Sequence, residues 1–310
     1  MTPTTHPPPP PIRRLLVGTD FSSGAAGAVT RVPLLPLAPR AEITLLHVMP
    51  AWLNPAIHGH EVRKAGDRLR RAAARLLRGL QAAGRDEVGV RTMLAQGEPW
   101  AEILRRSAKA DLVVVGRHGQ RSFRDLLVGS TAERVVRQAI VPTLLVGKRA
   151  RSTYRRPMAA VDRASGSRAT LDVAARLLDP GRRVLEVVHA YQPAHEGMLA
   201  RAGTPAGRAA YRRDCRMEAR RALAGIIRGS AAAVVVRRLR LRRGDPRHAI
   251  ITAARGCRAD LVALGTHGRT GLGHALLGSV AEAVMRHATC DVVVAPPPRP
   301  ARPKIGRAHV

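Results

Sequence analysis

The sequence predicts an α/β fold made of two tandem doubly wound domains, each with a five-stranded, mainly parallel sheet. Three observations carry this prediction: an internal repeat, short apolar runs that alternate with helical patterns, and a composition suited to a globular core. Of the 310 residues, 45% are hydrophobic, which is enough to bury a core in each half. This composition argues against a wholly disordered chain.

The internal repeat has the size of a domain. The segment DLVVVGRHGQRSFRDLLVGSTAERVV begins at Asp111, and DLVALGTHGRTGLGHALLGSVAEAVM begins at Asp260. Since one repeat covers about 145 residues, far more than a solenoid unit, we interpret the chain as a duplicated domain. The expected organisation is a disordered proline-rich segment at 1–11, a first domain at 12–148, a second domain at 157–296 and a disordered tail at 297–310.

The last six residues, Ile305 to Val310, match one reading frame of a common sequencing-adapter sequence. We interpret them as an assembly artefact and leave them out of the fold prediction.

Five short apolar runs predict the strands of the first half. They are RRLLVGTD from Arg13, AEITLLHV from Ala41, VGVRTMLAQG from Val88, DLVVVG from Asp111 and PTLLVG from Pro142. Continuous apolar runs of this kind are typical of parallel strands that are covered on both faces.

Helix signals lie between these strands. Apolar residues recur every three or four positions from about Glu61 to Ala83, which predicts a helix whose other face is rich in arginine. Pro99 and Pro246 indicate helix starts, because the first turn of a helix needs no N–H from proline. Prolines at 33, 36 and 39 predict that the first crossover helix is short or broken.

The second half repeats this order. Strands are expected near Met158–Asp162, Arg183–His189, Ala233–Leu241, Asp260–Gly265 and Asp291–Ala295, after a linker near Lys148–Arg156. Repeated right-handed β-α-β units give a doubly wound sheet. A further hypothesis is that the closing strands PTLLVG and DVVVAP pair edge to edge, which would make an internal pseudo-dimer and hide two sheet edges.

The candidate binding motif is a glycine pattern present in both halves. It reads Gly-x2-Gly-x9-Gly-Ser, at Gly116, Gly119, Gly129 and Ser130, and again at Gly265, Gly268, Gly278 and Ser279. Each copy follows a buried strand and ends where a helix begins, so free amides and the positive end of the helix dipole would face a bound phosphate. The serine can cap the helix or donate to that phosphate. The alternative is that the glycines serve only a tight connection between strand and helix.

An aspartate follows the first strand of each half, Asp20 and Asp162. Its carboxylate can accept bonds from a ribose hydroxyl or an adenine amine, or it can cap the next helix, with Ser22 as the rival cap. His118 and His267 lie inside the glycine loops. A histidine in such a loop more often faces solvent than takes part in a reaction. We assign no catalytic residue. The Walker pattern and a first-turn GxGxxG are absent, which argues against P-loop hydrolases and typical dinucleotide dehydrogenases.

The charge balance is strongly basic. The formal net charge is +31, and all but four of the 53 basic residues are arginine. Such a surface attracts anions, but the arginines are scattered along the chain, which favours a compositional bias spread over solvated faces. Aromatic residues make up 2%, too few for base-stacking platforms.

The three cysteines, Cys215, Cys257 and Cys290, form no CxxC pair. Neither a disulfide framework nor a metal site is indicated, and a buried thiol near a helix end explains Cys290 better than a ligand does. No apolar run approaches the roughly 20 residues of a membrane span. We therefore expect a cytoplasmic protein with no membrane partner.

On these residues the chain resembles a tandem universal stress protein. The specific marks are VGTDFS, LLHV, the two glycine motifs and the closing apolar strands, over Arg13–Gly147 and Met158–Ala295. The resemblance implies Rossmann-like, adenine-nucleotide-hydrolase-like domains that bind ATP or a related adenine nucleotide, with or without Mg²⁺, as a stress sensor or switch. Beside the internal pseudo-dimer expected from the symmetry of the two halves, a homodimer stays open. The implied binding residues are Asp20, Val48, Gly116, Gly119, Gly129, Ser130 and Thr131 in the first half, and Asp162, Gly265, Gly268, Gly278, Ser279 and Val280 in the second.

The two halves depart from the family pattern in different ways. The second has no serine two residues after Asp162 and has Ala190 in the place of Val48. The first has bulky Arg121, Phe123 and Arg124 between its glycines. One site is expected to be weaker, and either half is open to that role. Three other functions stay open: a stress protein that binds only protein partners, an arginine-driven nucleic-acid binder, and a nucleotide hydrolase with at most weak ATPase activity.

Overall fold

The computed structural model describes residues 9–51, 55–119, 128–147, 150–164, 166–193, 204–266 and 277–296. The loop segments 120–127 and 267–276 of the two glycine motifs and the tail beyond 296 lie outside the described residues, as do residues 1–8. The expectations for the bulky loop residues, Gly268, His267 and both chain ends therefore stay predictions.

The first domain alternates strands and helices as the sequence predicts. Its elements are β1 (Ile12–Gly18), α1 (Ser23–Arg31), the 3-10 turn η1 (Val32–Leu34), β2 (Leu37–Met49), α2 (Pro55–Ala82), β3 (Gly89–Gln96), α3 (Pro99–Ser107), β4 (Leu112–Gly116), α4 (Ser130–Gln138) and β5 (Thr143–Val146). The crossover helix α1 has nine residues and ends in η1, which contains Pro33, so the expected short helix is confirmed.

Two boundaries in this domain differ from the prediction. Strand β2 begins at Leu37 rather than Ala41, because Leu37 pairs with Ile12 of β1 before the register shifts. Helix α2 begins at Pro55 rather than Glu61, and its early residues Gly59 and His60 are exposed, so the apolar spacing could not mark them.

The second domain contains all five expected strands. Its elements are β6 (Pro157–Ala160), α5 (Gly166–Arg176), β7 (Leu185–Tyr191), α7 (Pro205–Arg228), β8 (Val236–Arg243), α8 (Pro246–Gly256), β9 (Leu261–Gly265), α9 (Ser279–His287) and β10 (Asp291–Ala295). Pro246 opens α8, and the side chain of Asp245 caps it by accepting a hydrogen bond from the backbone N–H of Arg247.

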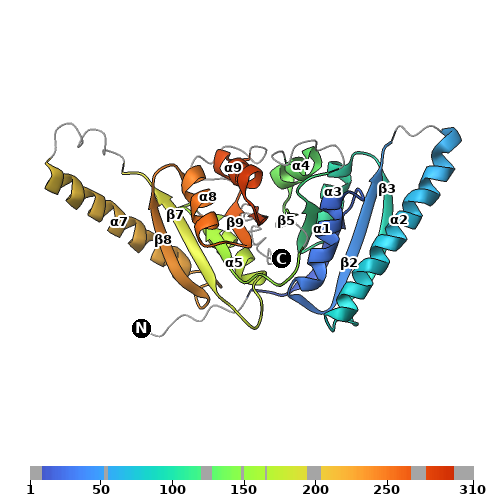
Figure 1. Cartoon of the computed structure of the whole chain (residues 1–310), viewed down its shortest axis with the longest axis horizontal. Helices are drawn as coiled ribbons and strands as arrows, with labels where there is room; N and C mark the ends of the chain where they lie inside the picture. Colours follow the sequence, from blue (N-terminus) through green and yellow to red (C-terminus); the bar gives the residue numbers. More distant parts are fainter. Residues whose placement is uncertain are drawn as a thin grey trace, which may run out of the picture.

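The ten strands form one continuous sheet in the order β3-β2-β1-β4-β5-β10-β9-β6-β7-β8. All neighbours are parallel except β5 and β10, which pair antiparallel with Leu144 opposite Val293. The two domains therefore lie side by side, joined through their last strands, with the long helices α2 and α7 at the two outer ends (Figure 1). The pseudo-dimer hypothesis is confirmed, and both closing strands lose their free edges.

Helices cover both faces of the sheet. One apolar core packs α1, α2, α5 and α7 against one face, and a second core packs α3, α4, α8 and α9 against the other. The strands read as continuous apolar runs because both of their faces are buried in this way. Within the described parts of the chain, none of the helices combines the length and the apolarity that a membrane span requires.

A buried polar cluster joins the domains beside the β5–β10 pair. The carboxylate of Asp291, at the start of β10, accepts hydrogen bonds from Arg31 Nε and the Tyr154 hydroxyl, both at 2.8 Å, and from the Gly147 N–H at 3.0 Å. The Arg31 guanidinium also lies 4.2 Å from the centroid of the Tyr154 ring. Burial raises the pKa of Tyr154 well above its ordinary value, so this hydroxyl keeps its proton.

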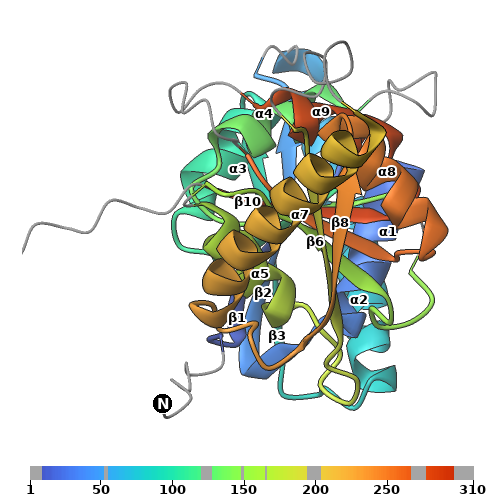
Figure 2. The same ribbon diagram turned by 90° about the vertical axis from the view of Figure 1, so that its left-hand side faces the viewer.

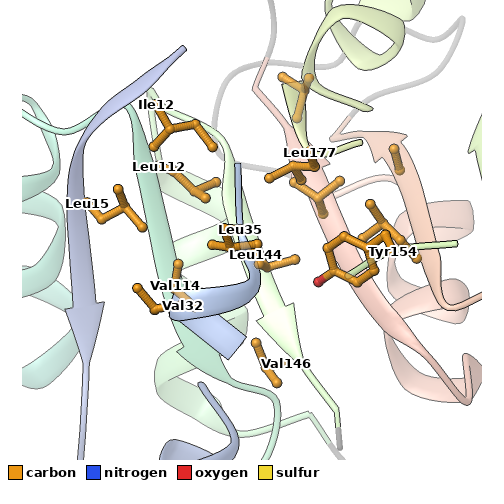
Figure 3. Close-up of a cluster of buried hydrophobic side chains, with 14 of the residues drawn as sticks. Ile12, Leu15, Val32, Leu35, Leu112, Val114, Leu144, Val146, Tyr154 and Leu177 are labelled. Carbon is orange, nitrogen blue, oxygen red and sulfur yellow. The ribbon is translucent and has the colours of Figure 1, made fainter. Parts of the chain in front are cut away.

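Around this cluster the apolar side chains of both domains are continuous. Leu144 and Val146 lie on the first-domain side, and Tyr154 and Leu177 lie on the second-domain side (Figure 3). Arg117, at the end of β4, donates to the carbonyl oxygens of Ala288 and Cys290 across the same junction. The domains are therefore held by an apolar core and by directed polar contacts.

Candidate functional site

A cavity of about 780 Å³ opens at the carboxyl ends of the second domain's strands. This volume lies in the range typical of small-molecule sites, and the place is where open α/β sheets bind ligands. Five of the six residues that the sequence predicts for this half line it: Asp162, Gly265, Gly278, Ser279 and Val280. Gly268 lies outside the described residues. Sequence positions more than a hundred residues apart thus meet at one cavity.

Both glycine motifs end in the same helix geometry. The N-caps of α4 and α9 are Gly129 and Gly278, so neither Ser130 nor Ser279 caps its helix. Each N-cap glycine donates its N–H at 2.8 Å to the carbonyl of the residue after the preceding strand, Arg117 or Thr266. The helices begin at Ser130 and Ser279. In the first turn the backbone N–H groups have no hydrogen-bond partner inside the helix. In the second domain Gly278, Ser279 and Val280 line the cavity.

The carboxylate of Asp162 is oriented by its own loop. Its Oδ1 accepts hydrogen bonds from the Ala164 N–H at 2.9 Å and from the Ser167 hydroxyl at 2.8 Å. Both of these bonds end on Oδ1, and Asp162 lines the cavity. Ser167 thus replaces the serine that is missing two residues after Asp162.

In the first domain the structure brings Asp20 and the glycine loop together. Ser22 caps α1 by accepting from the Ala25 N–H, and Asp20 Oδ1 accepts from the N–H and hydroxyl of Ser22 at 2.9 and 2.5 Å. The cap is therefore Ser22, and Asp20 orients it. A Cβ atom built on Gly119 would lie 2.9 Å from Asp20 Oδ2, so the two residues are neighbours.

The other predicted residues of this half lie at the same strand edge. Gly116 ends β4, Gly129, Ser130 and Thr131 begin α4, and Val48 lies near the end of β2 with its side chain against the α3–α4 core. The counterpart of Val48, Ala190, lines the cavity of the second domain.

A matched histidine supports the site in each domain. His47 Nδ1 donates to the Thr19 carbonyl at 2.7 Å, and His189 Nδ1 is paired with the Val161 carbonyl at 2.8 Å. Because a carbonyl only accepts, the proton sits on Nδ1 in both rings. Burial lowers the pKa of His47, which favours the neutral ring. These bonds fix the loop that carries Asp20 or Asp162 to the neighbouring strand.

The long helix of each domain is also tied to this loop, by different chemistry. In the first domain Phe21 lies 4.2 Å from the His47 ring and 4.4 Å beneath the guanidinium of Arg68 on α2. In the second domain Arg163, in the place of Phe21, pairs with Glu218 on α7 at 2.8 Å. Both contacts hold the outer helix beside the candidate site.

Comparison with known proteins identifies the family. The profile of the universal stress protein family matches residues 11–147 and again residues 153–296. The chain belongs to the universal stress protein family. It is a tandem member, since each half matches the profile separately.

Individual relatives agree with this assignment. This tandem universal stress protein is 31% identical to universal stress protein A homolog 1 of Coxiella burnetii over 45% of its own length and 94% of that protein. It is 46% identical to universal stress protein MJ0531 of Methanocaldococcus jannaschii over 56 residues, 33% of that protein. A solved universal stress protein of Archaeoglobus fulgidus shares the fold, with a TM-score of 0.66 at 18% identity over 92% of this chain and 98% of that one.

Sequence reasoning missed part of the wall of the cavity in this universal stress protein. Tyr211, Cys215 and Glu218 line it from α7, and Gly244 lines it from the end of β8. The helix gave a weak signal because only Ala219 and Leu223 of its residues are buried. Gly244 had a signal: Gly244-Asp245-Pro246 repeats Gly97-Glu98-Pro99, and both glycines have the positive φ that glycine adopts without strain, 119° and 135°.

No group of His, Cys, Asp and Glu residues suited to a metal ion occurs within the described ranges. Cys290 is buried, and burial raises the pKa of its thiol to about 12. The buried-thiol interpretation of Cys290 is therefore confirmed.

The cysteines of this universal stress protein should differ in reactivity. We expect a thiol-specific reagent at mildly alkaline pH to modify half-buried Cys215, which lines the cavity, and to spare Cys290 until the protein is unfolded, because only the thiolate reacts. Peptide mass spectrometry of the native and the denatured protein would measure this. Equal labelling of both thiols in the native state would contradict the buried position of Cys290.

Proposed function

We propose that this chain binds ATP or a related adenine nucleotide in the cavity of the second domain and acts as a sensor or switch. The observation that carries the proposal is the cavity itself, because it gathers the residues that the sequence had marked as a nucleotide site. The family membership supports the same function. Under this proposal hydrolysis is slow at most, since no base or nucleophile is assigned.

The roles follow from the geometry of the cavity. The amides of Ser279 and Val280, the Ser279 hydroxyl and the positive end of the α9 dipole would receive the phosphates. Asp162 Oδ2 would accept a bond from a ribose hydroxyl or a base amine at the other end. Tyr191 at the end of β7 and the following Gln192 and Pro193 line the cavity and would cover the nucleoside. A site with a donor end and an acceptor end selects a ligand with an anionic tail and a polar head.

The first domain would provide a second, related site. It has the same helix start at Gly129 and the same aspartate at position 20, with Phe21 and Arg68 closing the outer side. The stoichiometry is then one or two nucleotides per chain, and paired variants can separate the two sites.

The test compares Asp162→Asn with Asp20→Asn. In each variant the asparagine keeps Oδ1 as an acceptor for the loop but replaces Oδ2 with an amide nitrogen, which only donates. A charge-assisted hydrogen bond contributes about 1.5–3 kcal/mol, so we expect Asp162→Asn to weaken ATP binding by roughly tenfold or more. Isothermal titration calorimetry gives both the affinity and the stoichiometry, and unfolding curves establish that each variant is folded.

The Asp20→Asn variant serves as the matched control. If the second domain is the main site, Asp20→Asn leaves its affinity unchanged and removes at most one of two binding events. Slowed labelling of Cys215 in the presence of ATP would provide an independent measure of occupancy in the second-domain cavity. Absence of heat and of protection at millimolar ATP would reject the proposal and favour a protein that acts only through partners.

A further inference from the structure

The outer edge of the second domain carries a concentration of arginines. Strand β8 is the last strand of the sheet, and five of its eight residues are arginine. Leu239 and Leu241 pack against the core beneath α7, so the alternating residues Arg238, Arg240 and Arg242 point to the opposite face. The charge is thus arranged in a row, with about 6.6 Å between alternate residues of a strand, in contrast to the even spread that the sequence suggested.

The matching edge of the first domain has a different character. Strand β3 is the other terminal strand of the sheet and contains a single arginine, Arg91. Gly97 and Gly244 are equivalent positions just after β3 and β8. When the two strands are aligned on these glycines, Met93 and Ala95 correspond to Arg240 and Arg242, and both pack against the α3–α4 core. A compositional bias would act on both edges alike. The arginine row is therefore a property of this one surface.

The charge of the β8 edge, which includes the row and Arg237 on the other face of the strand, is largely uncompensated. Arg240 is paired with Glu186 at 2.6 Å. Arg237, Arg238 and Arg242 are exposed and form no ion pair with any residue that the structure describes. Helix α7 runs beside β8 at this end of the molecule (Figure 2) and adds seven arginines over its 24 residues. An isolated sheet edge needs only a few charges to prevent strand pairing.

We propose that the outer edge of the second domain, formed by β8 with its arginine row on one face and α7 on the other, binds the phosphate backbone of double-stranded nucleic acid without reading its sequence. Arginine is suited to this role because its planar guanidinium binds phosphate through two hydrogen bonds. A linear row of cations matches a linear polyanion of high charge density. The scarcity of aromatic residues disfavours single strands, which bind by base stacking.

The test is binding of a short fluorescently labelled DNA duplex, measured by fluorescence anisotropy over a series of salt concentrations. We expect the variant with Arg237→Ser, Arg238→Ser and Arg242→Ser to bind far more weakly than the unaltered chain. The slope of log affinity against log salt should also become shallower, by roughly 0.9 for each phosphate that is no longer neutralised and so by about 2.7 for three such phosphates.

The matched control removes the same charge from the other end of the molecule, through Arg71→Ser, Arg75→Ser and Arg78→Ser on exposed positions of α2. The control should keep most of the affinity and the slope.

An equal loss in both variants would show that net charge alone drives binding and would overturn the proposal. So would failure of the duplex to bind at low salt, or tighter binding to acidic lipid vesicles or polyglutamate than to the duplex. ATP binding is measured on the same variants and should not change, so the two proposals fail separately.

Discussion

Replacing Asp291 with alanine should lower the free energy of unfolding by about 3–5 kcal/mol. The carboxylate is 3% exposed and accepts hydrogen bonds from Arg31, Tyr154 and the Gly147 N–H. Without it the Arg31 guanidinium would remain buried with no counter-charge, which costs more than the pair contributes when intact. Urea denaturation followed by circular dichroism measures the change.

A surface ion pair provides the control for this substitution. Glu282 and Arg286 on α9 are paired at 2.9 Å, and both side chains are 42% exposed. Glu282→Ala should change stability by only about 0.3–0.5 kcal/mol, because exposed pairs are screened by water. Equal effects of the two substitutions would contradict the view that the buried contacts of Asp291 stabilise the junction between the domains. A double variant with Arg31→Met should recover part of the loss, since it removes the unpaired charge as well.

The fold was accessible to sequence reasoning where local patterns were strong. Apolar runs marked the central strands, the repeat and alternating leucines placed the arginine-rich β8, and Pro99 and Pro246 marked the first residues of α3 and α8. The edge-to-edge pairing of β5 with β10 was a hypothesis from the repeat, because two equivalent edges can cover each other, and the structure adds that the pair is antiparallel. Patterns that repeat locally and symmetrically therefore predicted the architecture.

The polar junction could not be read in the same way. Arg31 and Asp291 lie 260 residues apart, and neither is part of the repeat: the place of Asp291 in the first domain is held by Pro142. Their contact exists only because β5 and β10 pair in one particular register. Asymmetric contacts across a pseudo-twofold junction leave no trace in a duplicated sequence.

The residues of the candidate site that follow the strands were predicted from the sequence, whereas the residues that line its outer wall from α7 were not. The aspartates and glycines follow buried strands, which fixes their place at one sheet edge. Helix α7 buries little apolar surface, so the face that bears Tyr211 and Cys215 gave no periodic signal. For the glycine motif, the sequence left two roles open, approach to a phosphate and a tight connection between strand and helix.

Gly116 has a packing role that the structure makes explicit. A Cβ atom at this position would lie 2.5 Å from the carbonyl carbon of Gly24 and 2.8 Å from the N atom of Ala25, in the first turn of α1. The neighbouring atoms are backbone, so they cannot move aside as a flexible side chain can. We therefore expect Gly116→Ala to lower the free energy of unfolding by about 3 kcal/mol, the upper end of the usual cost of overpacking.

The experiment that distinguishes packing from ligand approach measures stability and nucleotide binding on the same variants. In the matched control, Gly225→Ala in α7, the added Cβ would have no described atom within 4 Å apart from its chain neighbours and the backbone of its own helix, and the change should stabilise the protein by about 0.5–1 kcal/mol through helix propensity. A Gly116→Ala protein of normal stability that has lost nucleotide affinity would contradict the packing role. The reverse result, a less stable protein that still binds through the second domain, would mean that the first glycine of this motif is required because β4 and α1 meet at their backbones. The phosphate-facing role would then belong to the helix start at Gly129 and Gly278, where the two domains have identical geometry.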